Sequence, residues 1–598
     1  MARTTSDLIV ERLVEWGIDT CFGINGDQIN GFMESLRTHA DQMRFIHVRH
    51  EENAALAAVG YAKFTGRPAA CVATAGPGAV HLLNGVYDAH IDGVPLIAVT
   101  GMSYHDLIGT HLIQDLDSPA LFSDACAFSE RVMGPAHAIN VTDMAVRRAL
   151  ADRGPSHLGI PIDVQSQTED TNSAKNPPAH TSLASQSQVP LPPEEQLHRA
   201  ADVLNACDRV AIMAGAGARG AGELVEQVAD ILGAPIVKAG LGKDAVPDDS
   251  PLTTGCMGLI GTRASHQALE ECDGFLIIGS SSPYYEFWPE LGQARGVQID
   301  VDPARIAMRY PVEVGLAGDA GATLAKLLPL LQPNPHRDFL ERAQATMADW
   351  WRLLEEQAGS TDMPMKPQAI AWQLGRLLPD NAIVTADAGS VTMWGARLRL
   401  RRGMQYSFSG THCTMGSAVP YAIGAKVAHP DRPVVAFLGD GAMAMGLGEL
   451  ATLAQYRLPV TVVVLRNDSL ALEVWEQNAL LGNPQYGCEL APIDFAKVAE
   501  ACGLTGLRIE RADQARDTLR DALAQDGPTL VDCLVDPYET PFGDVIKPTH
   551  ADKIATAYSR GEPGRARMAR SLLEPGRRQL SPAVQHAEDA LRGYIDDH

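Results

Sequence analysis

The amino-acid sequence predicts an α/β protein of three domains, each a mainly parallel sheet flanked by helices. Short apolar, β-branched runs alternate with helix-like stretches along nearly the whole chain, and several runs end in Gly, Ser or Asp. Near-continuous apolar runs are typical of strands buried on both faces of a parallel sheet, with functional loops at their carboxyl ends. The expected strands are Ala69–Thr74, Pro95–Thr100, Val210–Ala214, Pro235–Ala239, Phe275–Ile278, Val297–Val301, Ala382–Ala386, Val434–Leu438, Val460–Leu465 and Thr529–Val535.

Chain length and linker composition divide the sequence into units. The 598 residues suffice for three or four domains, and polar segments rich in Ser, Pro, Asn and Gln without apolar periodicity separate them. The last segment carries many arginines and few large apolar residues, so we expect a solvated or inter-subunit segment rather than a membrane-contacting helix. The expected domains are 1–168, 189–340 and 362–545, followed by a C-terminal tail over 546–598.

Composition excludes several classes of protein. The formal net charge of −24 makes nonspecific binding to nucleic acid or to an anionic membrane a poor expectation. No apolar stretch is long enough to span a bilayer, and the N-terminus lacks the apolar core of a signal peptide. The ten cysteines include no Cys-x-x-Cys pair, so we expect buried free thiols and a cytoplasmic location.

The most informative segment is a buried strand that ends in Gly-Asp-Gly, with Asp440 as its acidic residue. A second apolar strand ends at Asn467, 27 residues further on, and Ser469 follows. Mg²⁺ prefers six oxygen ligands, and the Asp440 carboxylate, the Asn467 amide and a main-chain carbonyl near Ser469 would supply three of them. Gly-Asp-Gly alone is common in turns, but the two strands and the spacing of the Asn favour a Mg²⁺-diphosphate site.

This spacing resembles that of the thiamine-diphosphate (ThDP) enzymes, and a segment in the first domain adds to the resemblance. It begins His50-Glu51-Glu52-Asn53 and enters an Ala-rich helix. In ThDP enzymes a glutamate here hydrogen-bonds N1′ of the aminopyrimidine and favours the imino tautomer, whose 4′-nitrogen deprotonates the thiazolium carbon. The resulting ylide attacks a 2-oxo acid, which then loses CO₂. The resemblance implies this role for Glu51, which on its own would equally be a favourable charge at a helix N-terminus.

A third segment, Gly410–Gly416, contains a residue that resembles the apolar wedge between the two cofactor rings of these enzymes. Met415 takes that position, and the backbone carbonyl of Cys413 would accept from the 4′-amino group. Without the resemblance, Met415 would be read as ordinary core. The residues expected to contact ThDP are Glu51, Gly389, Ser390, Cys413, Met415, Gly439, Asp440, Gly441, Ala442, Met443, Asn467, Leu470, Ala471 and Leu472, and the expected Mg²⁺ ligands are Asp440, Asn467 and Ser469.

Over about 540 of its 598 residues the chain is similar to the pyruvate oxidase and pyruvate:quinone dehydrogenase family, which is related to acetolactate synthase. In that family the strand-end loops of a central Rossmann-like domain bind FAD, and the corresponding loops are all present here. The alternative is a central domain that has lost its cofactor, as in simple 2-oxo acid decarboxylases. The residues expected to contact FAD are Gly215, Gly217, Arg219, Met257, Gly258, Leu259, Gly279, Ser280, Ser281, Asp300 and Asp319.

Residues 215–220 also match the G-x-G-x-x-G pattern of NAD-binding proteins. An NAD site would additionally want an acidic residue at the end of the next strand, about twenty residues on. The strand expected there ends near Lys238 and offers none. A nicotinamide-dependent dehydrogenase is therefore a distant alternative.

The sequence departs from its family beside the expected reaction centre. Ile113 precedes Gln114 where relatives usually have Phe, Ala471 replaces a Gly, and Glu473 takes an apolar position. If the alignment holds, a carboxylate here would repel a second anionic 2-oxo acid; otherwise Glu473 is a solvent-facing residue. The residues expected to take part in catalysis are Glu51, His81, Gln114, Glu473 and Glu476.

The resemblance implies decarboxylation of a small 2-oxo acid such as pyruvate, with the enamine intermediate oxidised through FAD. A second hypothesis is carboligation to an aldehyde or a second 2-oxo acid, with FAD structural. A remote third is a non-catalytic homologue. The resemblance also implies a homodimer or homotetramer whose active sites lie between subunits.

Overall fold

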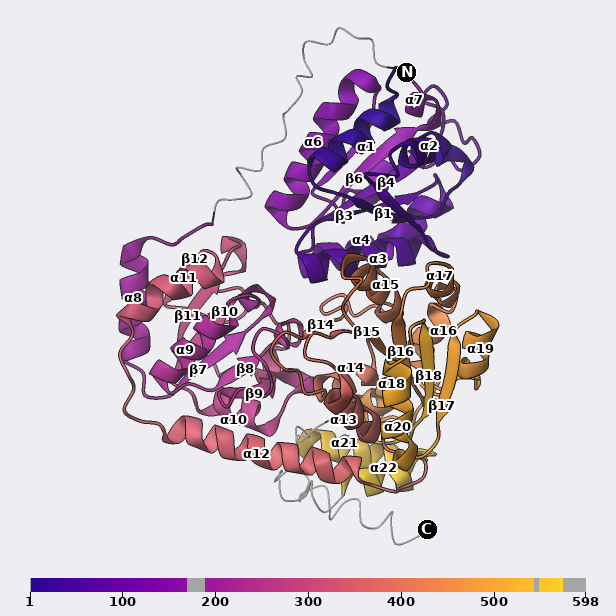
Figure 1. The fold of residues 1–598 in the computed structure, drawn as a ribbon. Coiled ribbons are helices and arrows are strands. Elements are labelled where there is room, and N and C mark those ends of the chain that lie inside the picture. The colour runs from indigo at the N-terminus through magenta and orange to yellow at the C-terminus, as the bar shows by residue number, and fades with distance from the viewer. Residues whose placement is uncertain (1, 169–188, 543–547, 574–598) are drawn as a thin grey trace.

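The computed structural model describes residues 2–168, 189–542 and 548–573. These residues contain three six-stranded sheets in which every paired strand runs parallel to its neighbour. Helices flank each sheet, and the three units are distinct in Figure 1. The predicted α/β class with three parallel sheets is thereby confirmed.

The first sheet has the strand order β2-β1-β3-β4-β6-β5. Its four inner strands, β1, β3, β4 and β6, are fully buried, and β3 and β4 have the apolar sequences typical of such positions. Its elements are α1 (Thr5–Glu15), β1 (Thr20–Gly23), α2 (Asn30–Thr38), β2 (Arg44–His47), α3 (Glu51–Thr65), β3 (Ala69–Ala73), α4 (Pro77–Asp92), β4 (Leu96–Met102), α5 (Ser118–Phe122), β5 (Phe128–Arg131), α6 (Pro135–Asp152), β6 (Pro155–Pro161) and α7 (Ile162–Gln165).

The central sheet has the order β12-β11-β10-β7-β8-β9, which is the order of a dinucleotide-binding Rossmann sheet. Ligands of such sheets bind where the strand order reverses, here between β7 and β10. Its elements are α8 (Glu194–Asn205), β7 (Val210–Ala214), α9 (Gly222–Leu232), β8 (Ile236–Lys238), β9 (Thr253–Cys256), α10 (Arg263–Glu271), β10 (Gly274–Ile278), β11 (Arg295–Asp300), β12 (Val314–Ala317), α11 (Ala320–Leu327) and α12 (Asp338–Ala358).

The third sheet, β14-β13-β15-β16-β18-β17, repeats the strand order of the first. Its order reverses between β13 and β15, and open α/β sheets bind their ligands at the carboxyl ends of the strands where the order reverses. Its elements are α13 (Pro367–Leu377), β13 (Ile383–Ala386), α14 (Ser390–Ala396), β14 (Gln405–Ser407), α15 (Ala418–Ala428), β15 (Val434–Gly439), α16 (Asp440–Met445), α17 (Glu449–Gln455), β16 (Val460–Arg466), α18 (Ala471–Glu476), α19 (Phe495–Ala501), β17 (Thr505–Ile509), α20 (Ala512–Leu523) and β18 (Thr529–Leu534).

The first domain packs on the third through the equivalent helices α3 and α15, which face each other in Figure 1. Two glycines let the helix backbones approach closely. A Cβ at Gly424 would lie 2.0 Å from the carbonyl oxygen of Ala57, and one at Gly60 would lie 2.5 Å from the Cα of Tyr421. At the end of this contact the buried Lys63 ammonium donates to the carbonyl of Phe408 and to the hydroxyl of Tyr421.

The described part of the C-terminal tail differs from expectation. Helices α21 (Pro548–Ser559) and α22 (Arg565–Leu572) pack against α18, where Ile554, Tyr558 and Met568 are buried with Trp475. The prediction of a solvated segment is therefore wrong for residues 549–573, whereas a contact of this segment with another subunit stays a prediction. The few apolar side chains of this segment fall on one side of each helix and suffice to close a small core. Residues 574–598 lie outside the described part of the chain.

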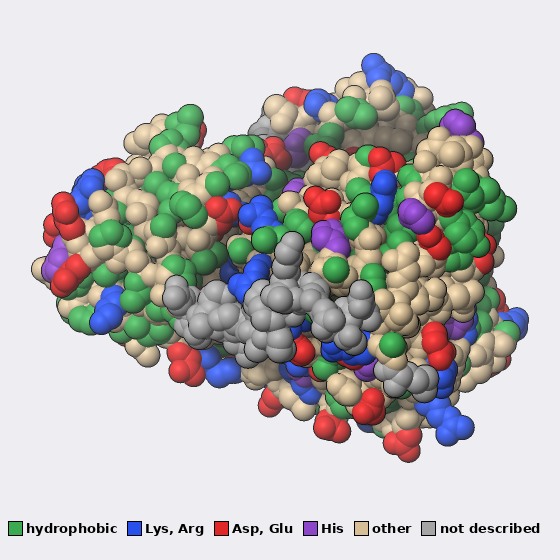
Figure 2. All heavy atoms as spheres, turned by 90° about the horizontal axis from the view of Figure 1, so that it is seen from above, with side chains coloured by type: hydrophobic (Ala, Val, Ile, Leu, Met, Phe, Trp, Pro, Cys, Tyr) green, Lys and Arg blue, Asp and Glu red, His purple; other side chains and the backbone are tan. Residues whose placement is uncertain are grey.

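The surface shows how the acidic excess is distributed. On the face drawn in Figure 2, acidic and basic side chains are interspersed with apolar ones and do not form a field of one sign. Among the described helices, none is both long and apolar enough to cross a bilayer. All ten cysteines are unpaired, and eight are buried.

Candidate cofactor-binding site

Asp440 begins helix α16 at the end of β15 and organises the expected metal-binding residues. Its buried carboxylate accepts backbone N–H groups of Gly441 at 2.9 Å, Asn467 at 3.0 Å and Asp468 at 2.6 Å. The Asn467 amide oxygen in turn accepts the N–H of Ser469 at 3.1 Å. Burial raises the pKa of Asp440 to about 6, against the lowering effect of these hydrogen bonds. The fold thus brings together the three residues that the sequence predicts as Mg²⁺ ligands.

Two glycines leave room beside this cluster. A Cβ built on Gly439 or on Gly389 would meet nothing within 4 Å, and Gly389 has a φ of +105° that favours glycine. Gly389 directly precedes Ser390, the first residue of α14, on the neighbouring strand connection. An all-oxygen donor set with open space at adjacent backbone fits Mg²⁺ and a diphosphate. Ala442 and Met443 are buried in the core, so only their backbone could face a ligand.

Met415 lies against the Gly-Asp-Gly turn, as the wedge assignment requires. A Cβ at Gly441 would lie 3.2 Å from its Cε and 3.2 Å from Leu470. The turn that carries Met415 is held by a residue that the sequence analysis missed. The fully buried Asp387, at the end of β13, accepts N–H groups of Ala388, Gly416 and Ala418, each at 2.9 Å.

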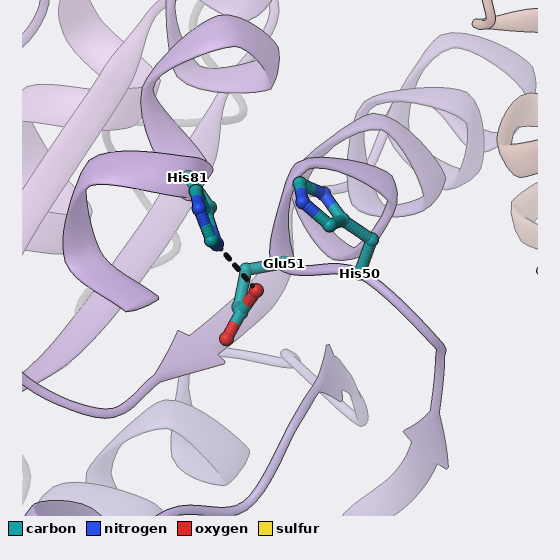
Figure 3. A group of neighbouring side chains, drawn as sticks. All are labelled: His50, Glu51 and His81. Atoms are coloured by element: carbon teal, nitrogen blue, oxygen red, sulfur yellow. Dashed lines mark hydrogen bonds and ion pairs between the residues drawn. The ribbon is translucent and has the colours of Figure 1, made fainter. Parts of the chain in front are cut away.

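Glu51 and His81 face each other in the first domain (Figure 3). Glu51 is the first residue of α3, preceded by the cap residue His50. Its Oε2 lies 3.0 Å from Nδ1 of His81, on α4, and the rings of His50 and His81 stack with centroids 4.6 Å apart. The three side chains place their donor atoms within 4.8 Å of one another. The Glu51 side chain is 14% exposed, so its carboxylate is largely enclosed by this group.

Gln114 lies next to this group. A Cβ built on Gly76 would lie 2.8 Å from the Cβ of Gln114, and one built on Gly78 would lie 3.3 Å from Oε1 of Glu51. The side-chain oxygen of Gln114 is buried, yet finds no hydrogen-bond partner among the described residues. A buried acceptor without a partner is costly unless a ligand or water completes it. Gln114, which packs on Gly76 before α4, thus has an unsatisfied polar atom in the part of the first domain that carries Glu51 and His81.

No hydrogen bond or ion pair among the described residues joins Glu51, His81 or Gln114 to Asp440 or Asn467. The first domain instead reaches the Met415 turn through Asn84, whose Nδ2 donates to Thr414 Oγ1 at 2.8 Å and to Glu52 at 2.6 Å. The sequence analysis did not identify Asn84, because nothing in its own segment indicates a partner 330 residues away.

The acidic residues beyond Asn467 lie on α18. Glu473 is exposed, whereas Glu476 is half-buried, and the pKa of Glu476 is raised by burial and by the charge of Glu473. Tyr284, in the central domain, was not identified from the sequence. Burial raises the pKa of Tyr284 most, and the charges of Cys413 and Glu476 raise it further. The charges of Cys413 and Glu476 in the third domain therefore act on an aromatic hydroxyl of the central domain. Leu470 and Leu472, on either side of Ala471 in the sequence, pack against the core that contains Trp475.

The central-domain loops lie at the strand-order reversal. Gly215 follows β7 and Gly279 follows β10, and a Cβ at Gly215 would lie 2.2 Å from the Gly279 carbonyl oxygen. Gly217 packs on Gly279 in the same way. These glycines therefore allow the two loops to meet at the position where a Rossmann sheet binds a dinucleotide.

Other expected FAD contacts are distributed around these loops. Asp300 ends β11 as a buried carboxylate whose pKa burial raises, and Asp319 caps α11. Arg219 is committed to Asp244 at 2.7 Å and to the carbonyl of Tyr406, and so joins the central and third domains. Arg305, missed in the sequence, donates to Ser281 at 3.3 Å. Of the remaining expected residues, Met257 and Ser280 are buried, Leu259 packs in the neighbouring core, and Gly258 lies against the Tyr284 ring.

The fold and this geometry define a class: three-domain α/β proteins with a candidate Mg²⁺-diphosphate centre on the third domain and a Rossmann-like central domain. Three protein-family profiles match the chain. They describe the N-terminal TPP-binding domain of thiamine pyrophosphate enzymes over residues 3–121, their central domain over 197–327 and their C-terminal TPP-binding domain over 387–533. The chain belongs to the thiamine pyrophosphate enzyme family.

Individual relatives agree with this assignment. The putative thiamine pyrophosphate-containing protein YdaP of Bacillus subtilis is 35% identical over 534 residues, covering 89% of this chain and 92% of the relative. A pyruvate oxidase of Lactiplantibacillus plantarum is 31% identical, covering 88% of each chain. A probable acetolactate synthase large subunit of Methanocaldococcus jannaschii is 32% identical, covering 89% of this chain and 92% of its own. The expected relationship to both kinds of enzyme is confirmed.

Proposed function

We propose that the chain is a Mg²⁺- and ThDP-dependent enzyme that decarboxylates a small 2-oxo acid such as pyruvate and passes the electrons to FAD. The observation that carries the proposal is the arrangement around Asp440. An all-oxygen donor set, open glycines and the Met415 side chain meet where the strand order of the third sheet reverses. This arrangement suits a diphosphate held through Mg²⁺ with an apolar wedge beside it.

When bound, ThDP supplies an electron sink that accepts the electron pair released with CO₂. Asp440, Asn467 and the main chain near Ser469 would hold the metal, and Met415 would fix the bend between the rings. Glu51 would hold a proton at N1′ of the pyrimidine, and its contact with His81 keeps the carboxylate oriented. Glu476 and Tyr284 would line the substrate side and exclude water from it.

The oxidative step is favoured by the position of the central domain. Tyr284 comes from the β10–β11 connection, the same connection as the flavin-loop residues Gly279, Ser280 and Ser281. Leu259, another residue expected to contact FAD, packs in the same apolar core as Leu470 and Leu472 of the third domain. The loops proposed for FAD and the expected thiazolium side thus belong to one neighbourhood, as electron transfer between two cofactors requires.

The second candidate is an acetolactate synthase-like carboligase with structural FAD, favoured by relatives of that kind at comparable identity. Anaerobic addition of pyruvate to the enzyme loaded with ThDP, Mg²⁺ and FAD separates the two candidates. The oxidase predicts loss of the oxidised flavin absorption at the rate of CO₂ release. CO₂ release with 2-acetolactate as product and an unchanged flavin spectrum would establish the carboligase instead. Absence of both ThDP binding and CO₂ release would leave a non-catalytic homologue.

We also propose that the active site closes between two copies of the chain. Apolar side chains are exposed beside each half of the site: Val80 and Ile113 adjoin His81 and Gln114, and Met445 ends α16. Ile113 is 73% and Met445 is 67% exposed. Exposed apolar groups that flank unsatisfied functional residues are typical of a subunit interface.

A further inference from the structure

A basic cavity lies on the side of the third domain away from the proposed cofactor site. It has a volume of about 860 Å³ and is lined by α12, α13, residues 397–401 and Asp249 of the central domain. Helix α12 runs along the base of the molecule toward the third domain in Figure 1. The volume falls within the range of small-molecule sites, roughly 300–1,000 Å³.

The topology separates this cavity from the candidate cofactor site. Lining residue Arg376 precedes β13, and Arg401 precedes β14, so both lie at the amino edge of the parallel sheet. Asp387, Asp440 and Asn467 follow β13, β15 and β16 at the opposite, carboxyl edge. The cavity is therefore not an extension of the ThDP or FAD region.

The lining is strongly basic, although the protein as a whole is acidic. Five arginines and only two carboxylates, Asp249 and Glu355, line the cavity. The lining arginines are Arg352, Arg376, Arg397, Arg399 and Arg401.

Arg399 is the most distinctive of the five. Its exposed guanidinium makes no hydrogen bond or ion pair with any residue that the structure describes, and it lies over the Trp351 ring at 5.3 Å. A second indole, Trp372, lines the same cavity. Arg376 has only a long, exposed pair with Glu355 at 3.5 Å, which contributes little. Arg352 and Arg401 pair with Asp349 and Asp380. The cavity thus offers the unpaired guanidinium of Arg399 and the weakly paired one of Arg376, together with aromatic surface.

The floor of the cavity is rigidly attached to the central domain. Leu400, between Arg399 and Arg401, exchanges two hydrogen bonds with Asp248: its N–H donates to the carboxylate at 2.8 Å, and its carbonyl accepts the Asp248 N–H. The Asp248 carboxylate is buried between the ammonium groups of Lys238 and Lys243. A ligand in the cavity would therefore contact both domains at a fixed junction.

We propose that this cavity binds a nucleoside polyphosphate. A guanidinium group can hydrogen-bond two phosphate oxygens at once. A polyphosphate therefore satisfies the donors of several arginines more completely than a single carboxylate or chloride would. The indole rings supply flat apolar surface for a base, and the volume accommodates both parts. Because the site touches the central and third domains, the ligand stabilises their junction and so acts on the enzyme away from its cofactors.

The test is calorimetric titration of ADP into the full-length protein saturated with ThDP, Mg²⁺ and FAD. Because the cofactors already fill the ThDP and FAD sites, ADP cannot bind there. We expect one ADP per chain, weaker binding of tripolyphosphate and no binding of adenosine. Arg399→Gln and Arg376→Gln should each weaken ADP at least tenfold. The matched control is Arg402→Gln, since Arg402 is exposed, pairs with Glu226 at 2.6 Å and does not line the cavity.

Three results would overturn the proposal. They are absence of ADP binding, equal affinity in the Arg399→Gln and Arg402→Gln variants, and tripolyphosphate binding as tightly as ADP, which would exclude a contribution from the base. Both glutamine variants alter exposed side chains, so circular dichroism and the melting temperature without ligand should match those of the parent. Because the cofactors are already bound, loss of the ADP response does not depend on which reaction the enzyme performs.

Discussion

The backbone N–H of Gly416 donates to the buried carboxylate of Asp387 at 2.9 Å, and this contact fixes the turn that carries Met415. The same carboxylate accepts from Ala418, at the start of α15. Asp387 thus connects the end of β13 to the helix that packs on the first domain. Its role is to position the wedge residue, not to react.

Replacing Asp387 by Ala should destabilise the protein and loosen the Met415 turn. Three backbone N–H groups would lose their buried acceptor, at a cost of about 3 kcal/mol or more. Asp387→Asn keeps one acceptor oxygen and should have a smaller effect. Thermal unfolding and the affinity for ThDP measure the two consequences, with the exposed Asp526→Ala as control. Equal melting temperatures for Asp387→Ala and Asp526→Ala would show that the contact is unimportant.

Asp440→Ala should weaken Mg²⁺-dependent binding of ThDP by roughly 100-fold or more, because the diphosphate would lose its bridging cation. Titration of ThDP at saturating Mg²⁺, followed by calorimetry, measures the loss. The binding of FAD should be unchanged, since its proposed loops lie on another domain. ThDP affinity at the parent level would contradict the metal assignment.

Mixed oligomers test whether the active site lies between chains. Glu51→Ala and Asp440→Ala should each abolish turnover when purified alone. After unfolding and refolding together in equal amounts, random pairing makes half of the dimers mixed, and each mixed dimer has one intact site of two, so about a quarter of the parent activity should return. A mixture that stays inactive, while the refolded parent regains its rate, would place both residues in a site within one chain.

Glu473 should influence the choice of acceptor. Glu473→Ile and Glu473→Gln remove a charge whose effect reaches Glu476, so repulsion of a second 2-oxo acid should weaken. With pyruvate alone, the variants should form more 2-acetolactate and less oxidised product. The control Glu356→Gln changes an exposed residue of α12. If product ratios and rates match the parent in all variants, Glu473 is a surface residue without a catalytic effect.

His157 should make the protein sensitive to acid. Burial lowers its pKa to about 3, and its ring stacks on Phe122 and bonds Thr100 and Ser129. The unfolded chain protonates near pH 6.5, so stability present above that pH falls by about 1.4 kcal/mol per unit as pH drops toward 3. The melting temperature of His157→Gln should therefore decrease less between pH 6.5 and 4.5 than that of the parent. A parallel decrease in both, and in the exposed control His198→Gln, would refute this.

The sequence predicted ten of the twelve inner strands and none of the six edge strands. All ten predicted strands are present, because burial on both faces demands apolar runs. The missed strands are short, like β14 with three residues, or carry polar residues, like the fully buried β6 with Ser156 and His157. Their side chains are satisfied by partners elsewhere in the fold, which a local pattern does not reveal.

The expected metal cluster came from sequence because its geometry is local to neighbouring parallel strands. Asp440 and Asn467 end β15 and β16, which pair directly, so their separation along the chain implies proximity in space. The partners of Asp387, in contrast, come from a turn about thirty residues later. An acid at a strand end does not indicate whether it binds a metal or a backbone turn.

By itself, the sequence determined the three-domain α/β class, the oxygen donors of the candidate metal site and the family, because strand burial and strand-end loops leave local signals. Only the tertiary structure revealed that the first and third domains share one strand order, which places Glu51 at the start of α3 and the Met415 turn before α15 in equivalent positions. It also showed that Asn84 joins Glu52 to the Met415 turn, and that Trp351, Arg376 and Arg399 line one cavity. Such relationships depend on how helices pack across long separations in sequence, and the free energy of that packing is distributed over many contacts that no single segment contains.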